Sequence, residues 1–476
     1  MQAYNPYLPS YEYIPDGEPY VFDGRLYVYG SHDKFGGQRF CENDYVCWSA
    51  PVDNLADWRC EGVIYRKTWD PMNADGSSCL YAPDVQQGPD GRYYLYYALD
   101  KLGIMSVAVC DSPAGDFAYY GCVRHADGQP VGANPGDIFQ FDPGIFMDDD
   151  GRVYLYSGFA PRAGWIDPQT FGGRRTEGAY CMELEPDMLT VKAGPKLVVL
   201  GPELAQGVGF DSHAFFEASS LRKIGGRYYL IYSSINSHEL CYATGDRPEG
   251  PFVFGGTLIS NGDVFLDGRT VEQAVGYMGN NHGSLVQVGG QWYVFYHRQT
   301  NRHGFSRQGC AEPIVIDAEG RIRQVEMTSC GLNGGPLAGH GRYEAYIACN
   351  LYYKGSAGFY GSTAYGEHPY LTQTGEDRED SPDQHIANMR HSAVAGFKYF
   401  DLRGTTGISV EAHGTAQGTL TVLSGPAGDV LARIPICAGE EYGVFSAGLD
   451  SPDGVSALFF LYEGEGAMDF RAFTLH

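Results

Sequence analysis

A hairpin phrase that recurs five times restricts the fold of this chain more than any other feature. Each copy has an Asp-Gly or Gly-Gly turn followed by alternating aromatic and β-branched residues, which is typical of a tight β-hairpin because glycine adopts a positive φ without strain. The copies read FDGRLYVYGS, PDGRYYLYYA, DDGRVYLYSG, IGGRYYLIYS and VGGQWYVFYH. The second glycine positions of their turns are 60 to 75 residues apart, at Gly24, Gly91, Gly151, Gly226 and Gly290. The chain therefore repeats one supersecondary unit five times.

The length of this unit indicates its architecture. A unit of 60 to 75 residues has room for four short strands and their loops. That size fits one blade of a β-propeller better than one turn of a solenoid. We therefore predict an all-β fold in which residues 1–334 form a five-bladed β-propeller. The whole chain of 476 residues is too long for one core, so a second domain is expected after the propeller.

The region after the last copy has a different pattern. The glycine-rich segment GLNGGPLAGHG at residues 331–341 is interpreted as a linker. Beyond it, the segments GISVEA, GTLTVLS, VLARIPI and ALFFLYEG alternate as strands do. Residues 342–476 are therefore predicted to form a β-sandwich of jelly-roll type. Within it, the charged segment QTGEDREDSPDQH at residues 373–385 is interpreted as a solvated loop.

The charge of the chain argues against some partners. With 33 basic and 58 acidic side chains, the net charge is −25 at pH 7. Such a surface repels phosphate backbones and anionic lipids, so neither a nucleic acid nor a membrane is expected as a partner. The sequence contains no run of about 18 apolar residues that would span a bilayer. It carries no signal for the oligomeric state.

The first residues and the cysteines favour a cytoplasmic location. The segment MQAYNPYLPSYEYIPDGEPY has neither the basic start nor the apolar stretch of a secretory signal. The 12 cysteines show no CxxC pair and no spacing typical of metal ligands. We interpret them as reduced and buried side chains, which is the usual state of cysteine in a reducing compartment.

A polar residue stands seven to nine positions before the turn glycine in every copy. In a propeller the innermost strand of each blade lines the central channel, so equivalent positions on the five strands converge at one end of that channel. The polar residues expected to meet there are Asp16, Asp84, Asp142, Glu217 and His282. Another set of acids lies inside the turns and is interpreted as turn formers, namely Asp23, Asp90 and Asp150.

Carboxyl groups that face one cavity are the groups that glycoside hydrolysis requires. One protonates the leaving oxygen, and the other activates water or attacks the sugar. A third acid near the proton donor raises the pKa of that donor by repulsion between like charges. Two acids have alternative interpretations: Asp16 precedes Gly17 as a turn residue does, and Asp84 fits a structural hydrogen bond as well as a catalytic role.

Six segments of the chain resemble glycoside hydrolase family 43, a group of five-bladed propeller arabinofuranosidases, xylosidases and arabinanases. They are IPDGEPYVFDGRLYVYGSHD, WSAPVDNLADW, LYAPDV, FDPGIFMDDDGRVYLYSG, FFEASSLRKIGGRYYLIYS and NNHGSLVQVGGQWYVFYHR. The resemblance covers all five copies in order, over about residues 4–330. Residues 342–476 are similar, less specifically, to a family 6 carbohydrate-binding β-sandwich.

The resemblance implies a role for three of the acids. Asp16 corresponds to the general base that deprotonates the attacking water, Glu217 to the general acid, and Asp142 to the residue that orients Glu217 and tunes its pKa. Family members invert the anomeric configuration, which implies acid and base carboxyl groups roughly 6.5–9.5 Å apart. Gly17 follows the base and Ala218 follows the acid where the family has proline and glycine, so the substrate subtype does not follow from the resemblance.

The resemblance also suggests contacts around these acids. Arg307 corresponds to an arginine that contacts the substrate, and the other predicted substrate-binding residues are Tyr81, Asp84 and Phe141. His282 corresponds to the axial histidine that holds either an ordered water or a calcium ion in the channel. No cofactor is expected for the chemistry itself.

We therefore expect an inverting glycoside hydrolase that releases terminal α-L-arabinofuranosyl or β-D-xylosyl residues from plant-derived oligosaccharides. A cytoplasmic enzyme meets oligosaccharides rather than polymers, which favours an exo-acting pocket. The alternatives are an endo-1,5-α-L-arabinanase with a groove open at both ends, and a propeller lectin that binds sugar without cleaving it. The presence of all three acids argues against the lectin. We interpret the sandwich as a support for the propeller in preference to a sugar-binding module.

Overall fold

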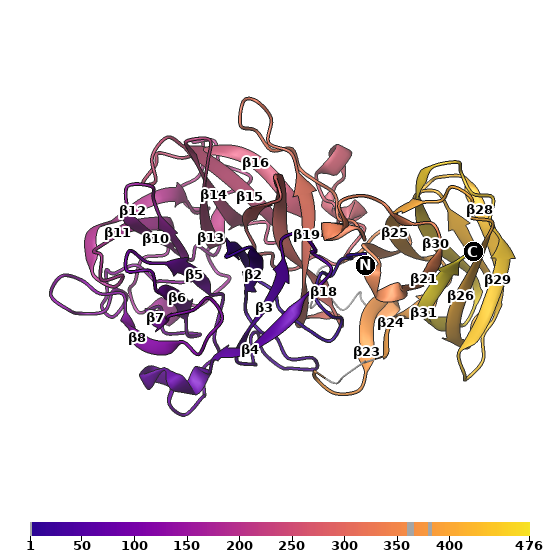
Figure 1. Ribbon diagram of the computed structural model, residues 1–476, viewed down its shortest axis with the longest axis horizontal. Helices are drawn as coiled ribbons and strands as arrows, with labels where there is room; N and C mark the ends of the chain where they lie inside the picture. The colour runs from indigo at the N-terminus through magenta and orange to yellow at the C-terminus, as the bar shows by residue number, and fades with distance from the viewer. Residues whose placement is uncertain (1, 359–365, 379–382) are drawn as a thin grey trace.

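The computed structural model describes residues 2–358, 366–378 and 383–476, whose strands form seven sheets. Five of these sheets follow one another around a common axis and make up the propeller, coloured indigo to pink in Figure 1. Four blades have four strands each, and the fifth has three. In every blade the strands stand in chain order, so the first strand of each sheet is the one nearest the axis.

The strands of the five blades have the following bounds. Blade one consists of β1 (Glu18–Phe22), β2 (Arg25–Tyr29), β3 (Tyr45–Pro51) and β4 (Arg59–Tyr65). Blade two consists of β5 (Asp84–Gln87), β6 (Tyr93–Ala98), β7 (Met105–Cys110) and β8 (Ala118–Cys122). Blade three consists of β9 (Gly144–Met147), β10 (Val153–Ser157), β11 (Gly178–Leu184) and β12 (Val191–Leu200). Blade four consists of β13 (Phe215–Ile224), β14 (Arg227–Ser234), β15 (Glu239–Gly245) and β16 (Val253–Ser260). Blade five consists of β17 (Leu285–Val288), β18 (Gln291–Thr300) and β19 (His303–Ile314).

The recurring turns join the first and second strands of each blade. At the first of them Asp23 and Gly24 have φ values of 47° and 76°, the geometry of a type I′ turn, which follows the twist of the two strands. The Asp90 and Asp150 carboxylates each accept a hydrogen bond from the backbone N–H two residues later. The interpretation of these three acids as turn formers is confirmed.

The ring closes through the segment that precedes the first blade. The Asn5 side chain donates to the Ala311 carbonyl and accepts from the Ala311 N–H, both at 2.9 Å. The Tyr7 N–H donates to the Gly309 carbonyl (3.3 Å). This segment therefore runs alongside β19, on the edge where the other blades have a fourth strand.

The remaining two sheets face each other in a sandwich, coloured orange to yellow in Figure 1. One sheet contains β20 (Leu337–Ala338), β25 (Ala393–Asp401), β30 (Val455–Glu465), β27 (Gln417–Leu423) and β28 (Val430–Cys437), with β22 (Asn350–Tyr353) paired to β25. The other contains β23 (Tyr370–Thr374), β24 (Asp383–Arg390), β31 (Ala467–Leu475), β26 (Gly407–Gly414) and β29 (Gly443–Gly448), with β21 (Gly341–Glu344) paired to β31.

A single aromatic core holds the two sheets of the sandwich together. Phe397 and Phe460 from one sheet contact Phe470 and Phe473 from the other, with ring centroids 4.9 Å apart for Phe397 and Phe473 and 5.3 Å apart for Phe460 and Phe470. All four side chains are fully buried, so each contributes roughly 1.5–3 kcal/mol of transfer free energy. The predicted all-β architecture, five blades followed by a sandwich, is confirmed.

The charged segment 373–385 agrees only in part with the sequence interpretation. Gln373 in β23 and Gln384 in β24 are buried, and Asp377 between the strands contacts the propeller. Residues 379–382 of the segment lie outside the described residues. The solvated-loop interpretation holds for residues 374–376 and Arg378, which are exposed, and is wrong for the buried glutamines of the two strands and for the half-buried Asp377. The partners of these polar groups belong to the propeller and leave no trace in the local composition.

The helical segments of the described ranges are single 3-10 turns. None of the helices there has the length and the apolar character needed to cross a bilayer. The turns are η1 (Lys67–Trp69), η2 (Pro71–Asn73), η3 (Pro168–Phe171), η4 (Leu266–Gly268), η5 (Val271–Gln273), η6 (Gly331–Asn333) and η7 (Ala345–Ile347).

Candidate active site

Most of the residues predicted at the end of the channel meet in one cavity of about 820 Å³. The predicted residues that line it are Asp16, Asp142, Glu217, His282, Arg307, Tyr81 and Phe141. Asp16 and Asp142 each stand two residues before the first strand of a blade, and His282 stands three residues before β17. Because these first strands surround the axis, residues just before them gather at the same rim.

The backbone at the three acids is turned into an unusual conformation. Asp16 and Asp142 have φ values of 58° and 45°, in the left-handed region that few residues other than glycine adopt. Glu217 lies in β13, where the pairing with β14 shifts register on both sides of it and Ala218 has a φ of 69°. Such a bulge re-aims a side chain, and here it directs Glu217 into the cavity. Backbone strain of this kind is concentrated at functional sites.

Asp16 is held as an anion by the groups around it. Arg307 Nη1 donates to Asp16 Oδ1 (3.1 Å), and His297 Nδ1 lies 3.2 Å from the same oxygen. Burial alone would raise the pKa of Asp16, but the Arg307 charge and the contact with His297 outweigh burial and hold this pKa well below its usual range. Asp16 is therefore ionised at any pH near neutrality.

Arg307 is itself fixed by Asp33, a residue that sequence reasoning missed. Arg307 Nε and Nη2 donate to the two oxygens of Asp33 at 2.8 and 2.9 Å, and the Phe40 ring centroid lies 4.9 Å from the guanidinium carbon. Arg307 and Asp33 are 2% and 0% exposed. A signal was present, because Asp33 follows β2, and the end of β2 lies beside the beginning of the antiparallel β1, where Asp16 stands.

The other two acids have the opposite electrostatic environment. Burial and then the Asp16 charge raise the pKa of Glu217 to about 8. The pKa of Asp142 is raised well above its usual range, first by burial and then by the charges of Glu217 and Asp16. Asp142 Oδ2 accepts a hydrogen bond from the Ala218 N–H (3.2 Å) and lies 3.6 Å from His282 Nδ1. The cavity thus contains one ionised carboxylate beside a carboxyl group that retains its proton.

Asp84 is the predicted site residue that does not line the cavity. It is fully buried deeper in the channel, where Tyr20 Oη and the N–H groups of Val85 and Ile145 donate to its carboxylate, each at 2.7 Å. The reason is its register, since Asp84 is the first residue of β5, whereas Asp16 and Asp142 precede their strands. Each residue of strand advances about 3.3 Å along the channel. The expected substrate contact is therefore corrected to a structural hydrogen-bond role.

The polar groups below the cavity include an unsatisfied pair. Glu18 Oε1 and His282 Nε2 are 3.9 Å apart, and neither has a hydrogen-bond partner among the residues that the structure describes. Burial lowers the pKa of His282 to about 4, so its imidazole is neutral and able to accept a hydrogen bond or bind a cation. The residues thus leave one carboxyl oxygen and one ring nitrogen facing the same gap.

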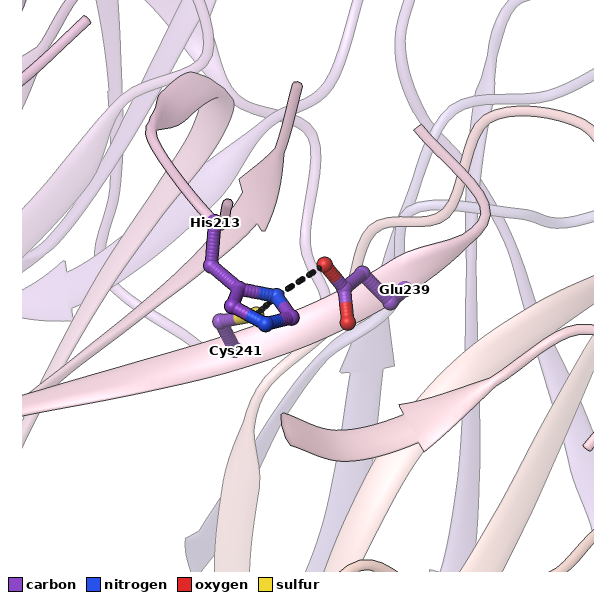
Figure 2. Close-up of side chains that lie close together, drawn as sticks. All are labelled: His213, Glu239 and Cys241. Atoms are coloured by element: carbon purple, nitrogen blue, oxygen red, sulfur yellow. Dashed lines mark hydrogen bonds and ion pairs between the residues drawn. The ribbon is translucent and has the colours of Figure 1, made fainter. Parts of the chain in front are cut away.

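A second cluster with metal-binding residue types contains His213, Glu239 and Cys241, and Figure 2 shows the His213 ring facing Glu239. The Glu239 carboxylate already has four partners, namely His213, Ser234, Asn236 and Thr257. Although burial opposes the charge, these hydrogen bonds lower the pKa of Glu239 to about 2. Burial raises the pKa of the Cys241 thiol far above its usual range, whereas a metal needs the thiolate. We interpret the cluster as a support for the adjacent cavity wall at residues 235–238.

One side of the cavity is a continuous aromatic wall. Tyr81 contacts Phe141 (5.6 Å between ring centroids), Phe141 contacts Phe159 (4.9 Å), and Phe159 contacts Phe216 (5.2 Å). Trp165 continues the wall outward and is 53% exposed. The sequence predicted Tyr81 and Phe141 but not the rest. Phe159 and Trp165 lie on the loop after β10, and Phe216 lies in β13, next to Glu217.

Sequence comparisons relate this chain to known proteins over its propeller and over its full length. The model of the Glycosyl hydrolases family 43 matches residues 14–322. A xylosidase/arabinosidase of Thermoclostridium stercorarium is 51% identical over 100% of this chain and 99% of its own length. A beta-xylosidase of Xylanibacter ruminicola is 30% identical over 67% of this chain and 98% of its own length.

Solved structures are similar in both parts of the chain. A GH43_1 enzyme of Xanthomonas citri, complexed with xylose, aligns with 67% of this chain and 91% of its own at a TM-score of 0.53 and 28% identity. An arabinoxylan arabinofuranohydrolase of Bacillus subtilis aligns with 99% of this chain and 97% of its own at a TM-score of 0.53 and 22% identity. The second similarity concerns the fold alone, and the likeness of the sandwich to a carbohydrate-binding module stays a prediction.

Proposed function

The chain belongs to glycosyl hydrolase family 43, and we propose that it is an inverting, exo-acting glycosidase that releases terminal α-L-arabinofuranosyl or β-D-xylosyl residues from oligosaccharides. Similarity to a xylosidase/arabinosidase over the whole chain supports both sugars. One observation carries the assignment of the site. Two carboxyl groups with opposite pKa shifts, those of Asp16 and Glu217, face the same cavity.

We assign Asp16 the role of general base. Its carboxylate is ionised in the free enzyme, and Arg307 holds one of its oxygens in place. A water molecule between Asp16 and the sugar gives its proton to the carboxylate as the water oxygen attacks the anomeric carbon. The attack comes from the face opposite the leaving group, so the configuration at that carbon inverts.

We assign Glu217 the role of general acid. The raised pKa keeps its proton in place below about pH 8, and this proton passes to the glycosidic oxygen as the bond to the anomeric carbon breaks. Asp142 anchors the backbone next to Glu217 through the Ala218 N–H, while burial and then the Asp16 charge keep the proton on Glu217. Solvent then returns a proton to Glu217 and removes one from Asp16.

The aromatic wall supports binding of the part of the substrate that leaves. Sugar rings present C–H groups on their faces, and aromatic side chains offer a matching apolar surface in ligand pockets. The wall extends from Phe141 beside the acids to the exposed Trp165. Such a surface has room for at least one further sugar residue beyond the bond that is cleaved.

We also propose that the gap between Glu18 and His282 holds an ordered water or a calcium ion. Calcium takes six to eight oxygen ligands. The gap offers one carboxyl oxygen and one imidazole nitrogen, so water would fill most of a calcium shell. A bound ion would hold His282 beside Asp142 and would supply positive charge below the acids.

Hydrolysis of three substrates tests the proposed function. The purified protein should cleave aryl α-L-arabinofuranoside or aryl β-D-xyloside and leave debranched arabinan largely intact. Proton NMR of the first sugar released should show the anomer opposite to that of the substrate. Faster cleavage of debranched arabinan would favour an endo-acting enzyme, whereas binding of sugars without any cleavage would favour a lectin.

A further inference from the structure

The sandwich reaches the propeller beside the active site through the hairpin of β23 and β24. In Figure 1 β23 is the strand of its sheet nearest to the propeller. The Asn301 N–H at the β18–β19 turn donates to the Leu371 carbonyl (2.8 Å), and Thr372 Oγ1 donates to the Asn301 side chain (2.9 Å). The described part of the hairpin continues past β23 to Asp377 and Arg378, which extend over blade one.

Asp377 contacts the segment that forms one wall of the cavity. This segment, residues 30–44 between β2 and β3, carries Phe40 and Cys41 at the cavity surface. Asp377 Oδ1 accepts a hydrogen bond from the Phe35 N–H (2.7 Å), and Asp377 Oδ2 accepts one from Asn43 Nδ2 (2.9 Å). One carboxylate of the sandwich therefore joins two points of the wall segment.

Asn43 also contacts Asp33, the residue that holds Arg307 in place. Asn43 Nδ2 also donates to the Asp33 carbonyl (3.1 Å). The Asp33 carboxylate binds Arg307, and Arg307 binds Asp16. Four successive hydrogen-bonded contacts thus lead from the sandwich domain to the carboxylate at the bottom of the cavity.

Further buried polar contacts fix the same junction. The Tyr13 hydroxyl donates to Gln373 Oε1 (2.6 Å) and accepts from Gln384 Nε2 (3.0 Å), while its ring stacks on Phe35 with centroids 5.6 Å apart. Arg378 lies 3.0 Å from the buried Glu12. Buried polar groups are costly to leave unpaired, so these contacts restrict the hairpin to one position on the propeller.

We propose that Asp377 is a positioning residue of the active site, through which the sandwich domain holds the wall segment so that Asp33 keeps Arg307 against Asp16. This inference rests on the proposed role of Asp16 as the base. It gives the C-terminal domain a task in catalysis that requires no sugar binding by that domain. Asp377 itself touches neither the cavity nor the substrate.

Kinetics of the full-length variant Asp377→Ala test the proposal. We expect kcat to fall by about tenfold or more with a smaller change in KM, because misplacement of a catalytic group lowers the rate more than binding. Asp377→Asn keeps one acceptor oxygen for the Phe35 N–H and should retain an intermediate rate. Asp429→Ala, at an exposed site on the turn between β27 and β28, is the matched control and should match the unmodified enzyme.

A pH profile separates positioning from a loss of stability. If Arg307 is held less firmly, the pKa of Asp16 rises, so the acid limb of kcat/KM should move to higher pH in Asp377→Ala. His297 and His282 also face Asp16 and stay unchanged in this variant. A lower melting temperature with an unchanged kcat and acid limb would overturn the proposal.

A double-mutant cycle with Asn43→Ala gives the decisive comparison. If Asp377 acts through Asn43, the double variant should lose no more activity than Asn43→Ala alone. If the two substitutions lower the activity independently, so that their fold-losses multiply in the double variant, the proposal is contradicted. Asp16→Ala, measured in the same series, distinguishes two kinds of failure. If Asp16→Ala remains active, the assigned base is wrong; if Asp16→Ala is inactive and Asp377→Ala is fully active, only the positioning role is wrong.

Discussion

The interior of the propeller channel and the cavity at its end contain the same residue types but pair them differently. In the interior, Arg222 donates to Glu18 (2.8 Å), and Asp84 has three hydrogen-bond donors. At the cavity, Arg307 is shared between Asp33 and Asp16, and Glu217 and Asp142 have no arginine of their own. Burial raises the pKa of acids in both regions, to about 8 for Glu18 and to about 6 for Asp84 in the interior. A raised pKa therefore does not by itself mark a reactive acid. The cavity differs because Arg307 holds Asp16 ionised there, and both Asp16 and the protonated Glu217 face open space.

Removing either acid at the cavity should have the largest effect. Asp16→Ala and Glu217→Ala should each lower kcat by about 10² or more, because each removes one partner of acid–base catalysis. Substrates with a good aryl leaving group should restore part of the activity of Glu217→Ala, because such a group leaves without protonation. They should not restore that of Asp16→Ala. Equal recovery of both variants would contradict the assignment of the two roles.

The pH dependence should report the proton on Glu217. Since burial and then Asp16 raise the pKa of this acid to about 8, kcat/KM should fall about tenfold per pH unit above that value. The acid form is the active one, so activity is lost as pH rises. An alkaline limb centred near pH 5 would show that Glu217 has an ordinary pKa and would remove its contrast with Asp16 in the cavity.

Substitution in the interior should affect stability instead of catalysis. Asp84→Asn places an amide N–H₂ group where the carboxylate accepts from the Ile145 N–H or from Tyr20, and so leaves a buried donor without an acceptor. We expect a loss of about 1–3 kcal/mol in the free energy of unfolding. Denaturant titration measures this loss, and the folded variant should keep its kcat. A fall in kcat without a loss of stability would place Asp84 in the active site after all.

A further effect concerns the stability that the folded protein loses by burying Glu217. The folded protein holds this proton up to about pH 8, while the unfolded chain releases it near the ordinary pKa of 4.5. The stability of the unmodified enzyme should therefore fall as pH rises from 4.5 towards 8, and Glu217→Gln should lack this component. Melting temperatures of both proteins should coincide near pH 4 and differ by a few degrees at pH 8. No difference at either pH would mean that Glu217 is not buried as an acid.

The repeated part of the site was accessible to sequence reasoning. Asp16, Asp142, Glu217 and His282 stand at equivalent positions of a repeated hairpin, so symmetry alone brings them together. Asp84 shows the limit of that symmetry, since a shift of one or two residues along a strand moves a side chain deeper into the channel.

The parts that escaped prediction depend on contacts between distant segments. Asp33 acts through Arg307, which stands far away in the sequence, and Asp377 acts through Asn43 on another domain. The position of Asp33 after β2 indicates that it lies near Asp16 but does not identify Arg307 as its partner, and no local pattern distinguishes Asp377 from an ordinary surface acid. The charge around Asp377 indicates a solvated loop, and Glu376 and Arg378 are exposed, but Asp377 between them is half-buried against the propeller.

The order in which the groups of the site appear along the chain has a consequence for biosynthesis. Asp16 leaves the ribosome early, its partner Arg307 emerges only with the fifth blade, and Asp377 follows later still. A nascent chain therefore carries the nucleophile-activating carboxylate long before the cation that orients it. The Arg307–Asp16 contact therefore cannot form until the fifth blade has been synthesised.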